Sequence, residues 1–112
     1  MHHFNRTRRL VKKSEFNHVF HKAQKVSWGC ITMLYKPNLL PHARLGFAIS
    51  KRFAAKAVVR NKIRRILKES FRLQSHLPAY DLVILLNRTC DKQSIDNLQQ
   101  NIEQLWQKLI AC

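Results

Sequence analysis

The order of elements is decided by the stretch RLGFAISKRFAAKAVVRNKIRRILKESFRLQSHLPAYDLVILL, residues 44–86. Its first part, residues 44–50, alternates larger apolar side chains with small or polar ones, which predicts a half-buried strand. Residues 57–74 have apolar side chains at helical spacing and predict a helix. The run DLVILL, residues 81–86, is continuously apolar after its aspartate and predicts a central strand buried on both faces. The stretch therefore predicts a strand–helix–strand unit.

Three further segments flank this unit. Ser14 is expected to cap a first helix, and Ser94 a last helix with an apolar inner face. Residues 26–36 are broken only at Gly29 and predict either a pair of strands or one long bent strand. We expect the 112 residues to form a single α+β domain, a two-layer α-β sandwich with one sheet and the order α-β-β-β-α-β-α.

The charge of the chain is strongly positive. Lys and Arg number 21 against 6 Asp and Glu, which gives a formal net charge of +15. Such a surface repels itself unless a polyanion neutralises it, so nucleic acid is the expected partner and an anionic membrane surface the second candidate. Residues 1–13 are basic with little apolar content, which predicts an arm that is loosely ordered until it binds a polyanion.

The predicted helix 57–74 has two separate faces. One arc is apolar and should face the core: Val59, Ile63, Ile66, Leu67, Ser70 and Phe71. A second arc is polar and mostly basic: Asn61, Arg64, Arg65, Lys68 and Arg72, with Arg60 at the seam and Lys62 on the far flank. Glu69 is the only acid of the helix, so internal ion pairs cannot compensate the charge. A charged face often serves solubility alone, but the whole-chain charge favours phosphate binding here.

Two phenylalanines, Phe16 and Phe20, lie four residues apart and share one face of the first predicted helix. Such a pair commonly belongs to a core. The alternative is a partly exposed platform on which unpaired bases stack. Both interpretations hold together if one edge of the helix lines a cleft.

The ionisable residues do not predict catalysis by the protein itself. The acids are scattered one per element, whereas a two-metal nuclease needs several carboxylates converging on ions about 4 Å apart. Four histidines, His2, His3, His18 and His21, occur in pairs that lack completing ligands and are expected to be surface imidazoles. We therefore assign no catalytic residue and no metal site.

The cysteines and the hydropathy pattern bear on the compartment. Cys30, Cys90 and Cys112 are far apart, as expected for reduced thiols in a cytosolic protein. No apolar run is long enough to span a bilayer, and the stretch MHHFNRTRRLVKK at residues 1–13 lacks the apolar segment of a signal peptide. The expected location is the cytoplasm, with no membrane partner.

Residues 44–72 and 77–85 closely resemble the protein subunit of bacterial ribonuclease P. The resemblance extends over nearly the whole chain, including SEFNHVF at 14–20. It is most specific in the RNR motif, where Arg60 and Asn61 match the first two positions and Lys62 replaces an arginine. It implies a small mixed sheet with a left-handed β-α-β crossover. It also implies an endoribonuclease in which a catalytic RNA, with its Mg²⁺ ions, hydrolyses precursor tRNA while the protein assists.

The resemblance assigns residues to two surfaces. Contact with the catalytic RNA is implied for Lys51, Arg52, Arg60, Asn61, Lys62, Arg64, Arg65, Lys68 and Arg72. Contact with the single-stranded 5′ leader of precursor tRNA is implied for a central cleft formed by Phe16, Phe20, Thr32 and Leu34. Tyr35 is adjacent to Leu34, and a shift of the strand register by one residue would exchange the two.

The resemblance also implies a monomeric protein within a 1:1 ribonucleoprotein. Two alternatives remain at this point. One is a ribosomal or other structural RNA-binding protein of similar fold, and the other is a stand-alone nuclease, which the scattered acids disfavour.

Overall fold

The computed structural model describes residues 9–10, 13–74 and 76–111. Its elements are α1 (Lys13–Phe20), β1 (Gln24–Trp28), β2 (Ile31–Pro37), β3 (Arg44–Ala48), α2 (Ala57–Arg72), β4 (Tyr80–Leu86), α3 (Lys92–Asp96) and α4 (Leu98–Ala111). The predicted order of helices and strands is confirmed, with the last predicted helix divided into α3 and α4. None of the helices in the described part of the chain has the length and apolar content needed to cross a bilayer.

The four strands form one mixed sheet in the order β1-β2-β4-β3. β2 is antiparallel to both β1 and β4, whereas β3 and β4 are parallel. β4 is therefore an inner strand, and its residues Leu82, Val83 and Ile84 are fully buried. The prediction of a strand buried on both faces is confirmed, and its continuous apolar run follows from that position.

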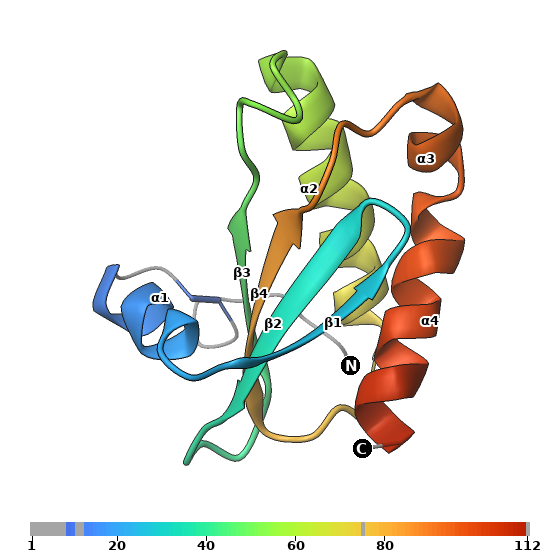
Figure 1. The fold of residues 1–112 in the computed structure, drawn as a ribbon. Helices are drawn as coiled ribbons and strands as arrows, with labels where there is room; N and C mark the ends of the chain where they lie inside the picture. The colour runs from blue at the N-terminus through green and yellow to red at the C-terminus, as the bar shows by residue number, and fades with distance from the viewer. Residues whose placement is uncertain (1–8, 11–12, 75, 112) are drawn as a thin grey trace.

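The connection from β3 through α2 to β4 is a left-handed crossover. With both strands pointing up in Figure 1, α2 lies behind the sheet and β4 lies to the right of β3. Nearly all such connections in proteins are right-handed, so this topology is rare. The handedness that the resemblance implied is therefore confirmed.

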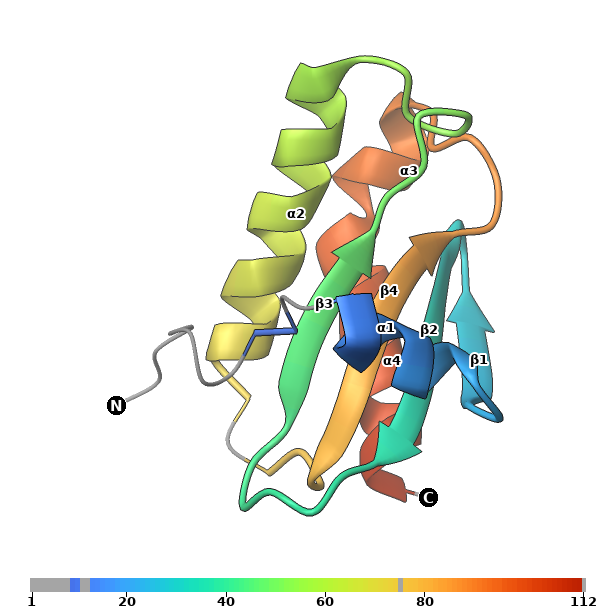
Figure 2. The same cartoon turned by 90° about the vertical axis from the view of Figure 1, so that its left-hand side faces the viewer.

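The two faces of the sheet carry different amounts of apolar packing. α2 and α4 cover one face with a large core that includes Phe71 and Trp106, and the indole Nε1 of Trp106 donates to Ser70 Oγ at 2.8 Å. The other face has a small core formed by Leu10, Val19 and Val83. Figure 2 shows the single short helix α1 in front of that face, with α4 behind the sheet. One face is thus only partly covered.

The two arcs predicted for α2 are confirmed. Ile63, Leu67, Ser70 and Phe71 are buried against the sheet and α4. Exposed along the outer side of the helix are Asn61, Lys62, Arg65 and Lys68. α2 ends at Arg72, two residues before the predicted Gln74, because Leu73 already serves as the C-cap.

Both predicted N-caps are wrong. α1 begins at Lys13, so Ser14 lies inside the helix. At the other end of the chain Asp91 is the N-cap of α3, since its Oδ1 accepts from the Ser94 backbone N–H at 2.8 Å. The side chain of an N-cap residue accepts a hydrogen bond from the backbone N–H two or three residues later. Asp91 occupies this N-cap position, so Ser94 lies in the first turn and donates its N–H.

The end of the predicted basic arm belongs to the fold. Leu10 is buried, and its backbone N–H donates to the carbonyl oxygen of Leu45 at 2.9 Å. Arg9 forms a parallel bridge with Leu45. The arm predicted over residues 1–13 is therefore too long at its C-terminal end, while residues 1–8 and 11–12 lie outside the described residues.

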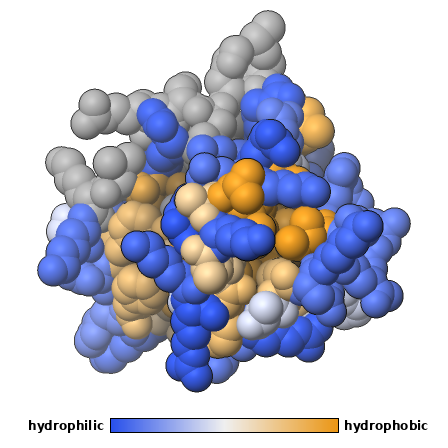
Figure 3. Space-filling view, turned by 90° about the horizontal axis from the view of Figure 1, so that it is seen from above, coloured by the Kyte–Doolittle hydropathy of each residue, from blue (hydrophilic) through white to orange (hydrophobic). Residues whose placement is uncertain are grey.

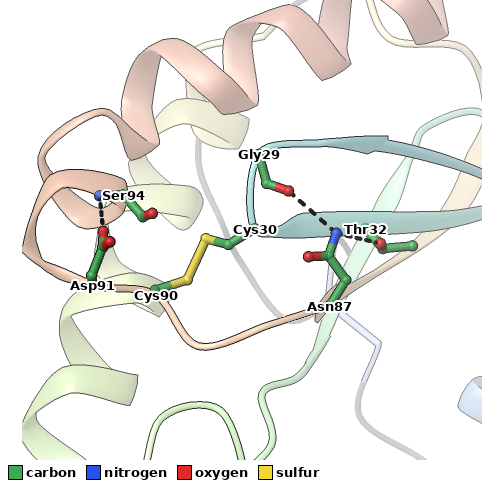
Figure 4. Close-up of a disulfide and its surroundings, with 7 residues drawn as sticks. All are labelled: Gly29, Cys30, Thr32, Asn87, Cys90, Asp91 and Ser94. Atoms are coloured by element: carbon green, nitrogen blue, oxygen red, sulfur yellow. Dashed lines mark hydrogen bonds between the residues drawn. A yellow bond between two sulfur atoms is a disulfide. The ribbon is translucent and has the colours of Figure 1, made fainter.

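Cys30 and Cys90 form a disulfide, so the prediction that these thiols are reduced is wrong (Figure 4). The two cysteines are 60 residues apart in sequence, but the strand order brings the start of β2 beside the end of β4. The Asn87 backbone N–H extends this pairing by donating to the Cys30 carbonyl oxygen at 2.9 Å. Cys112 lies outside the described residues.

Candidate nucleic-acid interface

The sheet face that α1 partly covers presents its side chains in rows, because paired strands place opposite residues side by side. The first row is Lys36, Asp81 and Arg44. The second row is Lys25, Leu34, Val83 and Gly46, and the third is Ser27, Thr32, Leu85 and Ala48. The rows give a frame for locating the predicted cleft.

The first row anchors α1. Arg44 forms ion pairs with both Asp81 of β4 and Glu15 of α1. Hydrogen bonding to Asp81 is the main cause that raises the pKa of the Arg44 guanidinium above its usual value. Lys36 donates from Nζ to the carbonyl oxygens of His18 and His21, at 3.2 and 3.1 Å, where the C-terminal end of α1 carries partial negative charge.

The second row receives Phe16. A Cβ placed on Gly46 would lie 2.7 Å from Cζ of Phe16 and 2.8 Å from Cβ of Leu10. The ring therefore rests on bare backbone that only glycine offers. Phe16 is half-buried and packs against the small core, whereas Phe20 is 47% exposed. Phe16 is thus partly core and partly the edge of a cavity, while its role in stacking bases stays a prediction.

The third row is left half-open. Thr32, Leu85 and Ala48 are half-buried, and Ser27 is exposed. Leu34 lies on this same face, whereas Tyr35 is 8% exposed and belongs to the core on the opposite face. The alternative register is therefore excluded, and the structure brings Phe16, Thr32 and Leu34 onto one face of the sheet.

The loop before α2 is held by Arg60. Its Nη1 donates to the carbonyl oxygens of Ala54 and Ala55, at 2.9 and 2.8 Å. Lys51 and Arg52 are exposed in this loop. The half-buried first residue of the RNR motif therefore holds the loop through its backbone, in addition to its position beside the basic face.

The basic side chains of α2 line two separate pockets. Arg64 and Lys68 line a cavity of about 340 Å³ at the outer edge of β3, together with Arg9, Leu10, Phe16 and Gly46. Arg65 lines a groove of about 370 Å³ between α2 and α4 with Glu69 and Glu103. The first cavity lies between Phe16 of α1 and the basic side of α2, whereas the groove contains acids that would repel phosphate.

Two pairs of polar side chains of α2 interact within the helix. Asn61 Oδ1 accepts from Arg64 Nη1 at 3.1 Å, which explains the asparagine as a local partner of the arginine one turn later. Arg72 pairs with Glu69. Lys62, which replaces the third residue of the RNR motif, is exposed.

The end of the molecule at which α2 begins is shown in Figure 3. Hydrophilic side chains form most of its outline and surround smaller apolar areas. Apolar exposure of this kind among hydrophilic side chains suits single-stranded nucleic acid, which offers both phosphates and base faces.

The residues that sequence reasoning missed are those that hold the cleft in shape. They are Glu15, Lys36, Arg44 and Asp81, with Arg9 at the edge of β3. The signal in the sequence was Asp81, an acid at the start of a strand that is otherwise wholly apolar. Buried acids require a partner, which points to a neighbouring arginine.

Among the described residues, no three His, Cys, Asp or Glu side chains gather where they could hold a metal ion together. His18 and His21 contribute backbone carbonyl oxygens to Lys36. His2 and His3 lie outside the described residues.

The chain matches the family model described as Ribonuclease P over residues 4–110. The chain belongs to the ribonuclease P protein family. It is 39% identical over 109 residues to the ribonuclease P protein component of Legionella pneumophila (strain Corby), covering 97% of this chain and 95% of that one. The ribonuclease P protein component of Chromohalobacter salexigens is also 39% identical, over 95% of this chain and 84% of its own length.

A solved structure of the ribonuclease P protein supports the same assignment. The Staphylococcus aureus protein superposes with a TM-score of 0.77 at 26% identity, covering 90% of this chain and 94% of that one. As in the rest of its family, the chain is a subunit of an endoribonuclease ribonucleoprotein that processes the 5′ end of tRNA, and its partner is an RNA subunit. The family assignment favours this role over a ribosomal protein or a stand-alone nuclease.

Proposed function

We propose that the chain binds two RNAs through the two surfaces described above, as a single RNA-binding domain. The catalytic RNA contacts α2 and the loop before it, through Lys51, Arg52, Arg60, Asn61, Lys62, Arg64, Arg65, Lys68 and Arg72. The 5′ leader of precursor tRNA lies in the cleft under α1, through Phe16, Phe20, Thr32 and Leu34.

The cleft suits a single strand because it combines apolar and basic surface. Bases can stack on the aromatic edge of α1, where Phe20 is exposed. Phosphates of the leader can contact Arg9, which lines the cavity at the edge of β3. The observation that carries the proposal is the cavity at this edge, since Phe16 of the cleft and Arg64 of α2 line it together.

The basic face of α2 suits a folded RNA. Its exposed cations are not matched by acids on the same helix, apart from Glu69. Phosphate contacts of this kind give affinity that falls steeply with salt and depends little on base sequence. Binding to a large RNA therefore neutralises charge that the fold leaves uncompensated.

Hydrolysis is assigned to the RNA subunit and the Mg²⁺ ions that it holds with the substrate. The described residues offer no cluster of metal ligands, and the acids nearest the cleft, Glu15 and Asp81, are engaged by Arg44. The protein's own contribution is to hold the leader and to screen phosphate repulsion. We propose one protein chain per RNA subunit, acting in the cytoplasm.

The decisive experiment is reconstitution with the cognate RNA subunit. The purified chain alone should not cleave precursor tRNA, and it should restore cleavage by the RNA at low Mg²⁺. Failure to restore cleavage, or metal-dependent cleavage by the protein alone, would overturn the proposal.

A second measurement tests α2 as the RNA-binding face. Replacing Arg60, Arg64 and Arg65 with alanine should weaken RNA binding and reduce the slope of log K against log salt by about 0.7–0.9 for each phosphate that the protein no longer neutralises. The control is Lys92→Ala, an exposed cation on α3 outside both surfaces. An unchanged slope in the triple variant would count against α2.

A further inference from the structure

The half-open third row ends in a polar cluster at the end of the sheet away from the Lys36 anchor. Ser27 Oγ lies 2.8 Å from Thr32 Oγ1, and Asn87 Nδ2 donates to Thr32 Oγ1 at 3.0 Å. Asn87 directly follows β4, and its contact with Thr32 places its side chain on the cleft face. The leader proposal assigns a role to Thr32 but none to Ser27 or Asn87.

The orientation of the Asn87 amide is fixed. Its Nδ2 also donates to the backbone carbonyl oxygen of Gly29 at 3.3 Å. A carbonyl oxygen can only accept, so the amide cannot be flipped without placing two acceptors together. Figure 4 shows both bonds on the nitrogen side, with Oδ1 directed away from Gly29 and Thr32.

The Asn87 backbone is fixed as well. Its N–H donates to the Cys30 carbonyl oxygen, and the disulfide joins Cys30 to Cys90 three residues further on. The side chain is nevertheless exposed, and among the described residues no hydrogen bond is made to Oδ1. Oδ1 is therefore a preorganised acceptor with a fixed orientation, so binding of a ligand to it costs little side-chain entropy.

The hydroxyl pair supplies the complementary group. Thr32 Oγ1 accepts from Asn87, and one of the two hydroxyls donates to the other. Whichever of Ser27 and Thr32 donates, one hydroxyl hydrogen remains for a ligand. The cluster thus presents one oriented acceptor and one donor beside the apolar side chain of Leu85, which lies opposite Thr32 in the sheet.

We propose that Asn87 is a further leader-binding residue, whose Oδ1 accepts a hydrogen bond from one nucleotide of the single-stranded 5′ leader. The inference rests on the proposed function. The donor is a ribose 2′-hydroxyl or an exocyclic base amine, both of which unpaired RNA exposes. The face of the base rests on Leu85, and Thr32 belongs to the same subsite.

The test uses the complete ribonucleoprotein and compares precursor tRNA that has a leader with the same tRNA lacking one. Asn87→Ala should weaken binding of the leader-bearing substrate about three- to tenfold, the net effect of one hydrogen bond. Binding of the leaderless tRNA should not change, and neither should the salt slope, because no charge is removed. Gln104→Ala, which removes an exposed amide on α4, is the matched control and should bind both substrates like the unaltered protein.

Leader analogues identify the donor and exclude a purely structural effect. Single 2′-deoxy substitutions along the leader form one arm, and bases lacking the exocyclic amine, such as purine for adenine, form the other. One substitution should weaken binding to the unaltered protein by the same factor and have no effect on the Asn87→Ala complex. Thr32→Val, which removes the hydroxyl at nearly constant volume, should show the same selectivity for leader-bearing substrate.

Two outcomes would overturn the inference. Asn87→Ala could bind leader-bearing precursor as tightly as the unaltered protein, or it could weaken binding of both substrates equally. Either result leaves the proposed function standing if the unaltered protein supports cleavage by the RNA. Failure of the unaltered protein to support cleavage would instead overturn the proposed function itself.

Discussion

Arg44 and Asp81 form a two-point ion pair across the parallel strands β3 and β4. Nε of Arg44 lies 2.8 Å from Oδ1 of Asp81, and Nη2 lies 2.7 Å from Oδ2. Asn38 Nδ2 donates to the same Oδ1 at 2.8 Å. Asp81 is 2% exposed, so its charge depends on these donors for compensation.

Asp81→Ala should lower the free energy of unfolding by about 3 kcal/mol, because it leaves the Arg44 guanidinium without its buried partner. The change can be measured by urea denaturation. Glu69→Ala is the control, since it breaks the exposed ion pair with Arg72 and should cost less than about 1 kcal/mol. If both variants lost the same free energy of unfolding, the buried ion pair of Asp81 would contribute no more to stability than the exposed ion pair of Glu69.

Gly46→Ala should destabilise the protein by about 1–3 kcal/mol, the usual cost of overpacking. The new methyl group would meet both Phe16 and Leu10, and the latter contact is at Cβ, which cannot rotate away. Thermal unfolding of Gly46→Ala, Phe16→Ala and the double variant checks the cause. The double variant should lose less stability than the sum of the losses of the two single variants. Strict additivity would contradict a clash between the new methyl group and the Phe16 ring.

Reduction of the Cys30–Cys90 disulfide should destabilise the protein by about 2–5 kcal/mol, as for native disulfides generally. The loop closed by the disulfide includes β2, β3, α2 and β4, so the unfolded state gains much conformational entropy when the disulfide is reduced. Melting with and without a reductant measures the difference. Cys112→Ser should show the same difference in melting temperature as the unaltered protein. Cys30→Ser should melt at the same temperature with and without the reductant. A difference that persists in Cys30→Ser would show that the reductant acts on something other than this disulfide.

The start of α3 should loosen in acid. The backbone N–H of Ser94 donates to Asp91 and lowers the pKa of this carboxyl below its ordinary value of 3.8. A lowered pKa means that the charged cap stabilises α3 above pH 3.8 and that this contribution is lost as pH falls through the lowered value. The Ser94 amide resonance should therefore titrate with Asp91 in an NMR pH series. Asp91→Asn should abolish that titration, and a Ser94 amide insensitive to Asp91 would contradict the cap.

Local periodicity predicted most of the fold. The alternation at residues 44–50 and the apolar run at 81–86 correspond to β3, which ends at Ala48, and to β4, because the spacing of apolar side chains indicates which faces of a strand can be buried. The two arcs of α2 follow in the same way from helical spacing. The handedness of the crossover came from the family resemblance, since periodicity says nothing about which way a chain turns.

The errors lie where several residues compete or where distant residues meet. Asp91 and Ser94 are both good caps, and spacing did not show which would accept from the other. The disulfide between Cys30 and Cys90 depends on β2 and β4 being neighbours, which only the sheet order reveals. For the same reason sequence reasoning did not single out Asn87, whose position depends on its contacts with Gly29 and Thr32.

The ion pairs of Arg44 with Glu15 and Asp81 also reduce the negative potential of the cleft. Of the six acids in the chain, these two are the only ones on α1 or on a strand. Both are held against one arginine, whose positive charge offsets one of the two negative charges before any phosphate arrives. An incoming RNA strand therefore meets a surface whose potential is set by the surrounding cations, although the face contains two carboxylates.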